Sequence, residues 1–317
     1  MTSQFFSSAY QFETNIIAEV NKAIGRKATS LDIFHNIITL LKKAIDEGAP
    51  LPHMQAYARL AIKLSPYATQ VTTLATIHNQ AVLADAQRRM PGLIEIVKSC
   101  RDQGLAVPLI ISCEKYMPAA LKLQQTFREH YFSIPPIIVR GSTSINEPVY
   151  EAPVLTLPVG DSYEALPVKI FEAYTFFQAI DRQGSIIKID DDLKPVTGFT
   201  PDRSNLVALF SHADYMGIPV QNIFHDRLWH DGKCGKAVPP VYAKPIKSSW
   251  ARGALYVLSH TALEKLALYY MRFPGCLDGE RYEDKAVGDV LHENSIHLTG
   301  YHLEPLLGLD SREQERS

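Results

Sequence analysis

Apolar side chains recur at helical intervals through the N-terminal part of the chain. After Ser30, a residue type that caps helices, they fall at i, i+1, i+4, i+5 and i+8, the spacing of one helix face. We therefore expect residues 1–103 to form an all-helical module, separable from the rest, that serves docking or oligomerisation. The apolar positions of its first clear helix are Ile33, Phe34, Ile37, Ile38 and Leu41.

The pattern then changes, and short, dense apolar runs replace helical spacing. Residues 107–112, 136–139 and 152–157 are rich in branched apolar residues, a composition typical of buried strands. Pro118 opens a helix between the first two runs. This β-α-β-β order predicts that residues 104–317 form an α/β domain, with a mixed, largely parallel sheet flanked by helices.

The rest of the chain repeats the alternation of helix and strand. Pro167 stands near the first turn of a helix that leads to a strand over residues 185–189. A further strand is predicted at 254–259, followed by a helix for which Thr261-x-x-Glu264 would be the capping box. Residues 195–250 show no such pattern, and we expect them to be irregular.

Composition and charge narrow the class of protein. The chain has 317 residues, of which 46% are apolar and 21% charged, as in soluble globular proteins. The net charge of −2 gives no electrostatic reason to expect a nucleic-acid partner. The cysteines are widely spaced, which argues against a zinc cluster or a disulfide framework and fits a reducing compartment. They are Cys100, Cys113, Cys234 and Cys276.

Two further features bear on cellular location. The N-terminal segment lacks a charged leader followed by an apolar core, so we predict no signal peptide. No apolar run reaches the roughly 18 residues of a membrane span. We expect a cytoplasmic protein, and peripheral association at the inner face of a membrane is left open.

The most distinctive stretch is a strand that ends in three carboxylates, Asp190-Asp191-Asp192. An apolar strand cannot carry three aspartates into a core, because uncompensated buried charge is too costly. The strand should therefore end at a cleft, where ligands bind in open α/β sheets. Oxygen ligands suit a hard divalent cation, and a cation that also holds a diphosphate needs only one or two carboxylates. The alternative is a solvated acidic turn.

A second acidic pair, Glu283-Asp284, stands at the start of a predicted short helix. Capping and the helix dipole explain one such carboxylate well and two less well. The same dipole leads us to expect that Asp284 is held in its ionised form. His297 and His302 follow, and either could complete a metal site with the aspartates.

Other polar positions are candidates for contacts with an anionic ligand. Ser112, Cys113 and Glu114 follow the first strand, a position that often borders a nucleotide, although an ordinary strand end is an equal alternative. The region between the two acidic motifs is rich in basic residues, of which a solvated loop explains most. These are Lys233, Lys236, Lys244, Lys247 and Arg252.

Four motifs in this order, followed by a late histidine, resemble the Fringe-like β-1,3-glycosyltransferase family, over about residues 105–305. The first two are a turn and helix, Asp161-x-Tyr163-x-x-Leu166-x-x-Lys169, and a strand ending in Asp190-Asp191-Asp192, the DDD form of the DxD motif. The run from Gly253 to Ser259 looks like the family's G-G-x-Y-V-L-S strand. Glu283-Asp284-x-x-Val287-Gly288 is similar to its E-D-V-x-V-G motif, and His302-Leu303-Glu304 to the region of its late metal histidine.

The resemblance implies a GT-A fold and an inverting sugar transfer. The donor would be a nucleotide sugar, usually UDP-linked, held with Mn²⁺ or Mg²⁺, and the acceptor a glycan or lipid-linked glycan in surface polysaccharide synthesis. Asp284 would be the general base, with Glu283 as the next candidate. The metal would be held by Asp190, Asp192 and His302, and the nucleotide contacted by Ser112, Glu114, Lys169, Asp190, Asp191 and Arg252.

Two other functions use the same residues. A metal-dependent phosphodiester or pyrophosphate hydrolase would employ the aspartates with two cations. A non-catalytic glycan-binding scaffold would place the function in the helical module. The hydrolase would need further His or Asp ligands at fixed spacing, which the sequence does not show, so we favour the transferase. For an inverting transfer by single displacement, one base suffices.

Overall fold

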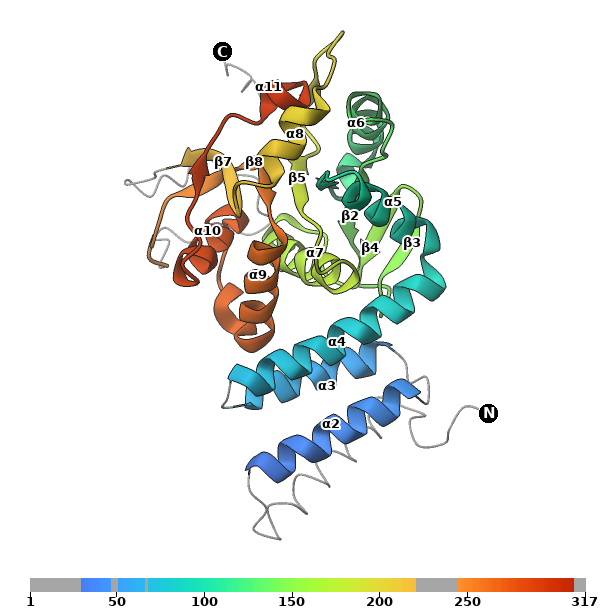
Figure 1. The fold of residues 1–317 in the computed structure, drawn as a ribbon, viewed down its shortest axis with the longest axis vertical. Coiled ribbons are helices and arrows are strands. Elements are labelled where there is room, and N and C mark those ends of the chain that lie inside the picture. The colour runs from blue at the N-terminus through green and yellow to red at the C-terminus, as the bar shows by residue number, and fades with distance from the viewer. Residues whose placement is uncertain (1–29, 47–50, 66–67, 221–243, 311–317) are drawn as a thin grey trace.

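The computed structural model describes residues 30–46, 51–65, 68–220 and 244–310. Within these residues the fold is mixed α/β, with an eight-stranded mixed sheet flanked by helices, as in Rossmann-like folds. Long helices from the N-terminal part lie across one end of this assembly (Figure 1). The predicted α/β class is therefore confirmed.

Apart from Ser65 and Met90, the described residues between 30 and 102 are helical. The first strand begins at Val107, so the change from helices to alternating strands lies where the hydrophobic pattern changes. No helix among the described residues is long and apolar enough to cross a membrane. The helices are α2 (Ser30–Asp46), α3 (Leu51–Leu64), α4 (Ala68–Arg89) and α5 (Pro91–Asp102).

The sheet has a parallel centre, and antiparallel pairs lie on both sides of it. Its order is β3-β4-β2-β1-β5-β8-β7-β9; β1 pairs in parallel with both β2 and β5, and β8 runs antiparallel to β5. From β1 the chain continues to β2 on one side, and it later returns to form β5 on the other side of β1. This reversal of direction makes a topological switch point between β1 and β5. The strands are β1 (Val107–Ile111), β2 (Ile137–Gly141), β3 (Val149–Glu151), β4 (Val154–Leu157), β5 (Ile186–Asp190), β7 (Tyr215–Val220), β8 (Trp250–Leu258) and β9 (Thr299–Gly300), and a separate ribbon joins β6 (Lys194–Pro195) to β10 (Leu309–Asp310).

Helices of the sheet region cover the strands and position the loops at their ends. The helix α7 is buried almost throughout, and it packs against α4, α9 and α10. The helix α10 packs on β8. The elements are η2 (Glu114–Tyr116), α6 (Met117–His130), η3 (Tyr163–Ala165), α7 (Leu166–Ile180), α8 (Arg203–Phe210), α9 (His260–Arg272), η5 (Pro274–Leu277), α10 (Glu283–Glu293) and α11 (Glu304–Leu307).

Two local predictions were wrong. The region predicted to be irregular contains α8 and β7, and β7 was missed because it contains glycine and proline, which weaken strands. Its pairing with β8 shifts register between Gly217 and Pro219, as at a β-bulge. The cap of α9 is Ser259, whose hydroxyl accepts from the Ala262 amide at 3.2 Å, and Thr261 lies one residue inside the helix.

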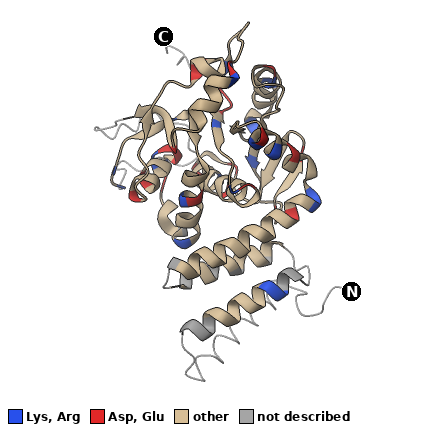
Figure 2. Ribbon diagram, in the orientation of Figure 1, with Lys and Arg blue, Asp and Glu red and all other residues tan. Residues whose placement is uncertain are grey.

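A partly buried ion pair joins the N-terminal helices to the sheet region. The described residues of α3 and α4 include few charged ones (Figure 2), yet Arg59 on α3 makes two hydrogen bonds, of 2.5 and 2.6 Å, to Glu172 on α7. The Tyr270 hydroxyl on α9 donates to the same carboxylate at 2.9 Å. The boundary at residue 103 and the separability of the helical module stay predictions. The contribution of the Arg59–Glu172 pair to the free energy of unfolding can be measured.

Replacing Arg59 with methionine is expected to lower the free energy of unfolding by about 1–3 kcal/mol, because it leaves the partly buried Glu172 carboxylate without its cation. The control is Arg88→Met, which removes one of the two arginine partners of Asp85, at a position where 74% of the arginine side chain is exposed. That change should cost less than about 1 kcal/mol. Urea unfolding of both variants measures the two losses of unfolding free energy. Equal losses would show that the Arg59–Glu172 pair contributes no more to stability than an exposed ion pair.

Candidate active site

The carboxyl ends of β1 and β5 meet at the switch point and carry the first predicted site residues. Ile111 and Asp190 are directly paired across these strands. Just beyond them, the Ser112 hydroxyl donates a 2.6 Å hydrogen bond to the Asp191 carboxylate. Ligands of open α/β sheets bind in the crevice at this position, so the structure brings Ser112 and the aspartate triplet together at a typical binding edge.

The three aspartates lie in different surroundings. Asp190 ends β5 and is half-buried, Asp191 is partly buried, and Asp192 is exposed. Burial raises the pKa of Asp190, opposed by Lys188 and reinforced by Glu283. The pKa of Asp191 is raised by burial, with Asp192 adding to it and Ser112 opposing it. Burial thus disfavours the charged forms of Asp190 and Asp191, and a bound cation would favour them.

A buried lysine lies behind the triplet. Lys188, at the centre of β5, has no solvent exposure. Its ammonium donates to the Asp190 carboxylate and to the Gly253 carbonyl, and it lies 3.4 Å from Glu283 Oε1. Burial by itself lowers the pKa of Lys188, but Asp190 and Glu283 outweigh burial and raise it above its ordinary value.

The second acidic pair lies in the first turn of α10, beside this lysine. Glu283 is buried and Asp284 is partly exposed. The Gly253 amide, on β8, donates to Asp284 Oδ2 at 3.1 Å, and the Lys285 amide donates to Oδ1 at 2.8 Å. Two motifs that are far apart in the sequence, one ending β5 and one opening α10, therefore meet around the Gly253 peptide.

The expected ionisation of Asp284 was wrong in direction. Burial and the neighbouring Glu283 raise the pKa of Asp284 to about 7, against the lowering effect of its hydrogen bond from the Lys285 amide. The helix dipole favours the ionised form by only about 0.3–1 kcal/mol near a surface, so desolvation and like charge prevail. A carboxylate with a pKa near neutrality is well matched to accept a proton.

Lys169 is at the same edge but is already engaged. Its buried ammonium donates to the Ser112 carbonyl at 2.6 Å and to Asp161 at 2.9 Å. Asp161 also accepts from the amides of Gly141 and Glu114, both at 2.8 Å. Lys169 thus holds together the loops that follow β1, β2 and β4; its predicted contact with a nucleotide stays a prediction.

Three other predicted residues lie further out. The Glu114 side chain is 78% exposed and pairs with Arg140. Arg252, next to Gly253 on β8, places its guanidinium 3.6 Å from Glu304. His302 is two residues before Glu304 and exposed, so the C-terminal segment lies against the same end of β8. None of these positions is tied to the triplet by a hydrogen bond in the part of the chain that the structure describes.

The remaining basic candidates divide into described and undescribed residues. Lys244 donates to the Cys276 carbonyl at 2.6 Å, and Lys247 pairs with Glu293. Lys233 and Lys236 lie outside the described residues. His297, the alternative metal histidine, is exposed and has its ring 5.5 Å from that of His292. The contacts seen for Lys244 and Lys247 are those of a loop held to the protein.

The carboxylates at this site could hold a hard cation only if other oxygen atoms complete its coordination shell. Among the residues that the structure describes, no three His, Cys, Asp or Glu side chains are grouped so as to hold a metal by themselves. Asp190 and Asp192 nevertheless offer carboxylate oxygen ligands, and a cation would favour the charged form of Asp190, which burial disfavours. Cations that complete their shell with phosphate oxygens and water need only one or two protein carboxylates. Manganese or magnesium at this edge stays a prediction.

Two groups at the site were missed in the sequence. Alternation along a strand puts Lys188 and Asp190 on one face, so a lysine two residues before the triplet was a readable signal of an internal partner. The Gly253 peptide carries no such signal, because its role depends on backbone atoms.

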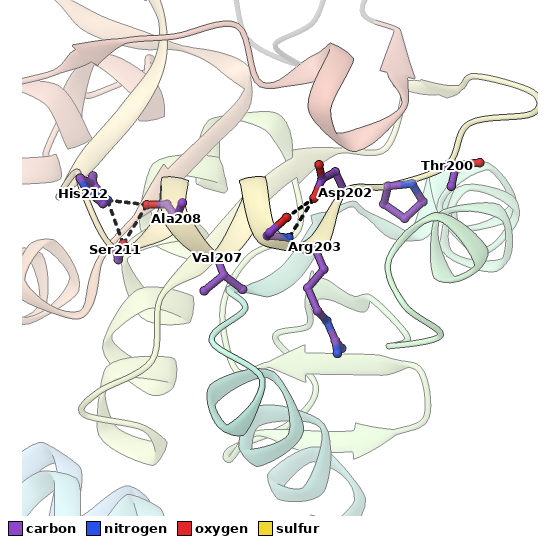
Figure 3. A pocket seen from close by; sticks show the side chains of 9 residues that line it. Thr200, Asp202, Arg203, Val207, Ala208, Ser211 and His212 are labelled. Atoms are coloured by element: carbon purple, nitrogen blue, oxygen red, sulfur yellow. Dashed lines mark hydrogen bonds between the residues drawn. The ribbon is translucent and has the colours of Figure 1, made fainter.

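A separate hollow runs along α8 and contains none of the predicted site residues (Figure 3). Two of its polar side chains hydrogen-bond to the backbone of α8 and its ends, and Arg203 donates to Gln103. Asp202 caps α8 by accepting from the amides of Ser204 and Asn205, and the His212 ring donates to the Ala208 carbonyl at 2.6 Å. This surface therefore adds nothing to the candidate site at β1 and β5.

Comparison with known proteins gave no match, either to a family model or to a curated protein. The likeness to Fringe-like β-1,3-glycosyltransferases thus depends on the motifs in this sequence.

Proposed function

We propose that the protein is an inverting, metal-dependent glycosyltransferase of GT-A fold. It would move a sugar from a nucleotide donor, in the first instance UDP-linked, to a hydroxyl of a glycan or lipid-linked glycan. One observation carries the proposal: the aspartate triplet at the end of β5 and the acidic pair of α10 meet at the carboxyl end of the strands, where such folds bind ligands. Lys188 and Glu283, which join the two motifs, are 95 residues apart in the sequence.

The donor side would be served by the triplet. Asp190 and Asp192, with His302 as a further ligand, would hold the cation, and Asp191, Ser112 and Lys169 would shape the loop against the nucleotide. When bound, the cation would stabilise the negative charge that develops on the leaving diphosphate. The hydrogen bond from Ser112 to Asp191 keeps the triplet's turn fixed against the end of β1.

The acceptor side would be served by Asp284. It is partly exposed, whereas Glu283 is buried and faces Lys188, so Asp284 is the carboxylate that a hydroxyl can reach. Two amides fix its orientation. An attacking hydroxyl must lose its proton, and a carboxylate within hydrogen-bond reach can take it. A single displacement with one base inverts the anomeric centre.

Binding of UDP is expected to depend on a divalent cation. Calorimetric titration with UDP in the presence of Mn²⁺ should give measurable affinity that chelation with EDTA abolishes. Asp192→Asn should weaken the metal-dependent binding by at least about tenfold, since it removes one unit of charge from the ligand set. Asp102→Asn, at a position exposed on α5, is the control and should bind normally. Equal affinity with and without EDTA would refute the proposed function.

A further inference from the structure

The lysine in β5 is the least expected charged residue of the fold. β5 is buried from Ile186 to Ile189, and apolar branched residues would fill every one of these positions without cost. Instead Lys188 places an ammonium where water does not reach. Desolvating a charge costs several kcal/mol, and well-packed apolar residues often replace buried ion pairs with no loss of stability. Stability alone therefore does not explain this residue.

The contacts of Lys188 join three segments of the candidate site. Its ammonium bonds to Asp190, in its own strand, to the Gly253 carbonyl in β8, and faces Glu283 in α10. The Gly253 peptide then continues the connection, because its amide donates to Asp284. A chain of contacts thus runs from the donor-side carboxylate through Lys188 and Gly253 to the acceptor-side carboxylate.

The space around this chain of contacts is tightly filled. A methyl group at Gly253 would lie 2.9 Å from Glu283 Oε1 and 3.3 Å from Asp284 Oδ2. The Tyr256 ring lies 5.7 Å from the lysine nitrogen, and its hydroxyl is 2.5 Å from that of Tyr174. The ammonium is therefore held in one place, and the carboxylates take their positions relative to it.

We propose that Lys188 is a positioning residue that fixes the separation between Asp190, on the donor side, and Asp284, on the acceptor side. The proposal rests on the proposed transferase function and adds to it a buried cation that touches neither substrate. Such a residue sets the alignment of donor and acceptor, and misplacement of about 1 Å can lower turnover about 10²-fold.

The first test is Lys188→Met, which keeps most of the side-chain volume and removes the ammonium. With Mn²⁺ and UDP-sugar, kcat for transfer should fall about 10²-fold, while the donor KM should change by less than about threefold. Arg59→Met is the control for a lost internal cation far from the site. It should lose stability and keep its kcat. Wild-type kcat in Lys188→Met would overturn the proposal.

A second variant separates positioning from charge balance. In Lys188→Met, Glu283 is left buried without its cation, which is strongly destabilising; adding Glu283→Gln removes that charge and should restore folding. We compare this double variant with Glu283→Gln alone. If Lys188 positions the site, stability recovers and kcat stays about 10²-fold below the single variant. Recovery of kcat together with stability would overturn the proposal.

A third measurement does not require activity. The Gly253 amide should exchange its hydrogen faster in the double variant than in Glu283→Gln, because its carbonyl has lost the lysine that fixes the peptide. Unchanged exchange at Gly253 would overturn the positioning role. Failure of the wild-type protein to bind or transfer any nucleotide sugar would refute the transferase function, and the exchange measurement would still decide the role of Lys188.

Discussion

Asp284→Asn is expected to lower the rate of sugar transfer by about 10²–10⁴-fold, the usual worth of a positioned general base. Donor binding should persist, since Asp190, Asp191 and Ser112 are untouched. Asparagine keeps the shape of the side chain, and its carbonyl oxygen can still accept one of the two amide hydrogen bonds. Calorimetry of UDP with Mn²⁺ and steady-state turnover on the same preparation measure the two effects separately.

The raised pKa of Asp284 adds a pH dependence with a definite sign. A base must be ionised to act, so wild-type turnover should fall as the pH drops below about 7. The free energy of unfolding changes with pH in the opposite sense to turnover. The folded state holds this proton more tightly than the unfolded state, so ionisation costs stability as pH rises from the ordinary carboxyl range to about 7. Without metal at pH 8, Asp284→Asn should therefore melt no lower than the wild type.

The control for Asp284 is Asp278→Asn, at an exposed position before α10, which should leave turnover and its pH profile unchanged. Intact turnover in Asp284→Asn with intact donor binding would remove Asp284 as the base. Glu283 would then be the next candidate, and it would have to act from a buried position beside Lys188.

Gly253→Ala is expected to lower turnover by about 10²-fold with the fold retained. The added methyl would approach Glu283 to 2.9 Å and Asp284 to 3.3 Å, and the first of these distances requires a shift. Glu283 is buried next to Lys188 and cannot turn into solvent. The displacement therefore passes to the carboxylates of α10, and the base moves away from its productive position.

The control for this substitution is Gly92→Ala in α5. There the new methyl would meet only the Tyr150 ring, at 3.9 Å, and alanine favours helix over glycine by about 1 kcal/mol. Thermal melting should show Gly92→Ala to be as stable as the wild type or more so, with normal turnover. Normal turnover in Gly253→Ala would show that the α10 carboxylates tolerate displacement.

The hydrophobic pattern was a good guide to elements whose burial is regular. The runs that became β1, β2 and β5 are buried on both faces, so most of their positions carry apolar residues, with Lys188 in β5 as the exception in the interior. The pattern failed at β7, where Gly217 packs close to Ala251 on β8 and Pro219 stands at the shift in register. The residue types at these positions depend on contacts with the neighbouring strand β8, and such contacts leave no periodic pattern in the sequence.

The candidate site was predictable in its carboxylates and not in what orients them. A run of aspartates after a strand is visible in the sequence because charge cannot enter a core. The orientation of Asp284 depends on the backbone amide of Gly253, and its pKa on the desolvation that the fold imposes. Neither a backbone contact across 31 residues nor a degree of burial can be read from the spacing of residue types.

The antiparallel entry of β8 beside β5 has a consequence for folding kinetics. The contacts that unite the two acidic motifs close loops of 95, 65 and 31 residues, and closing long loops is entropically costly and slow. Until β8 has paired with β5, the proposed base Asp284 lacks the Gly253 amide that orients it. We therefore expect activity to recover no earlier in refolding than this pairing, and local opening of β8 to lower activity before the rest of the fold is lost.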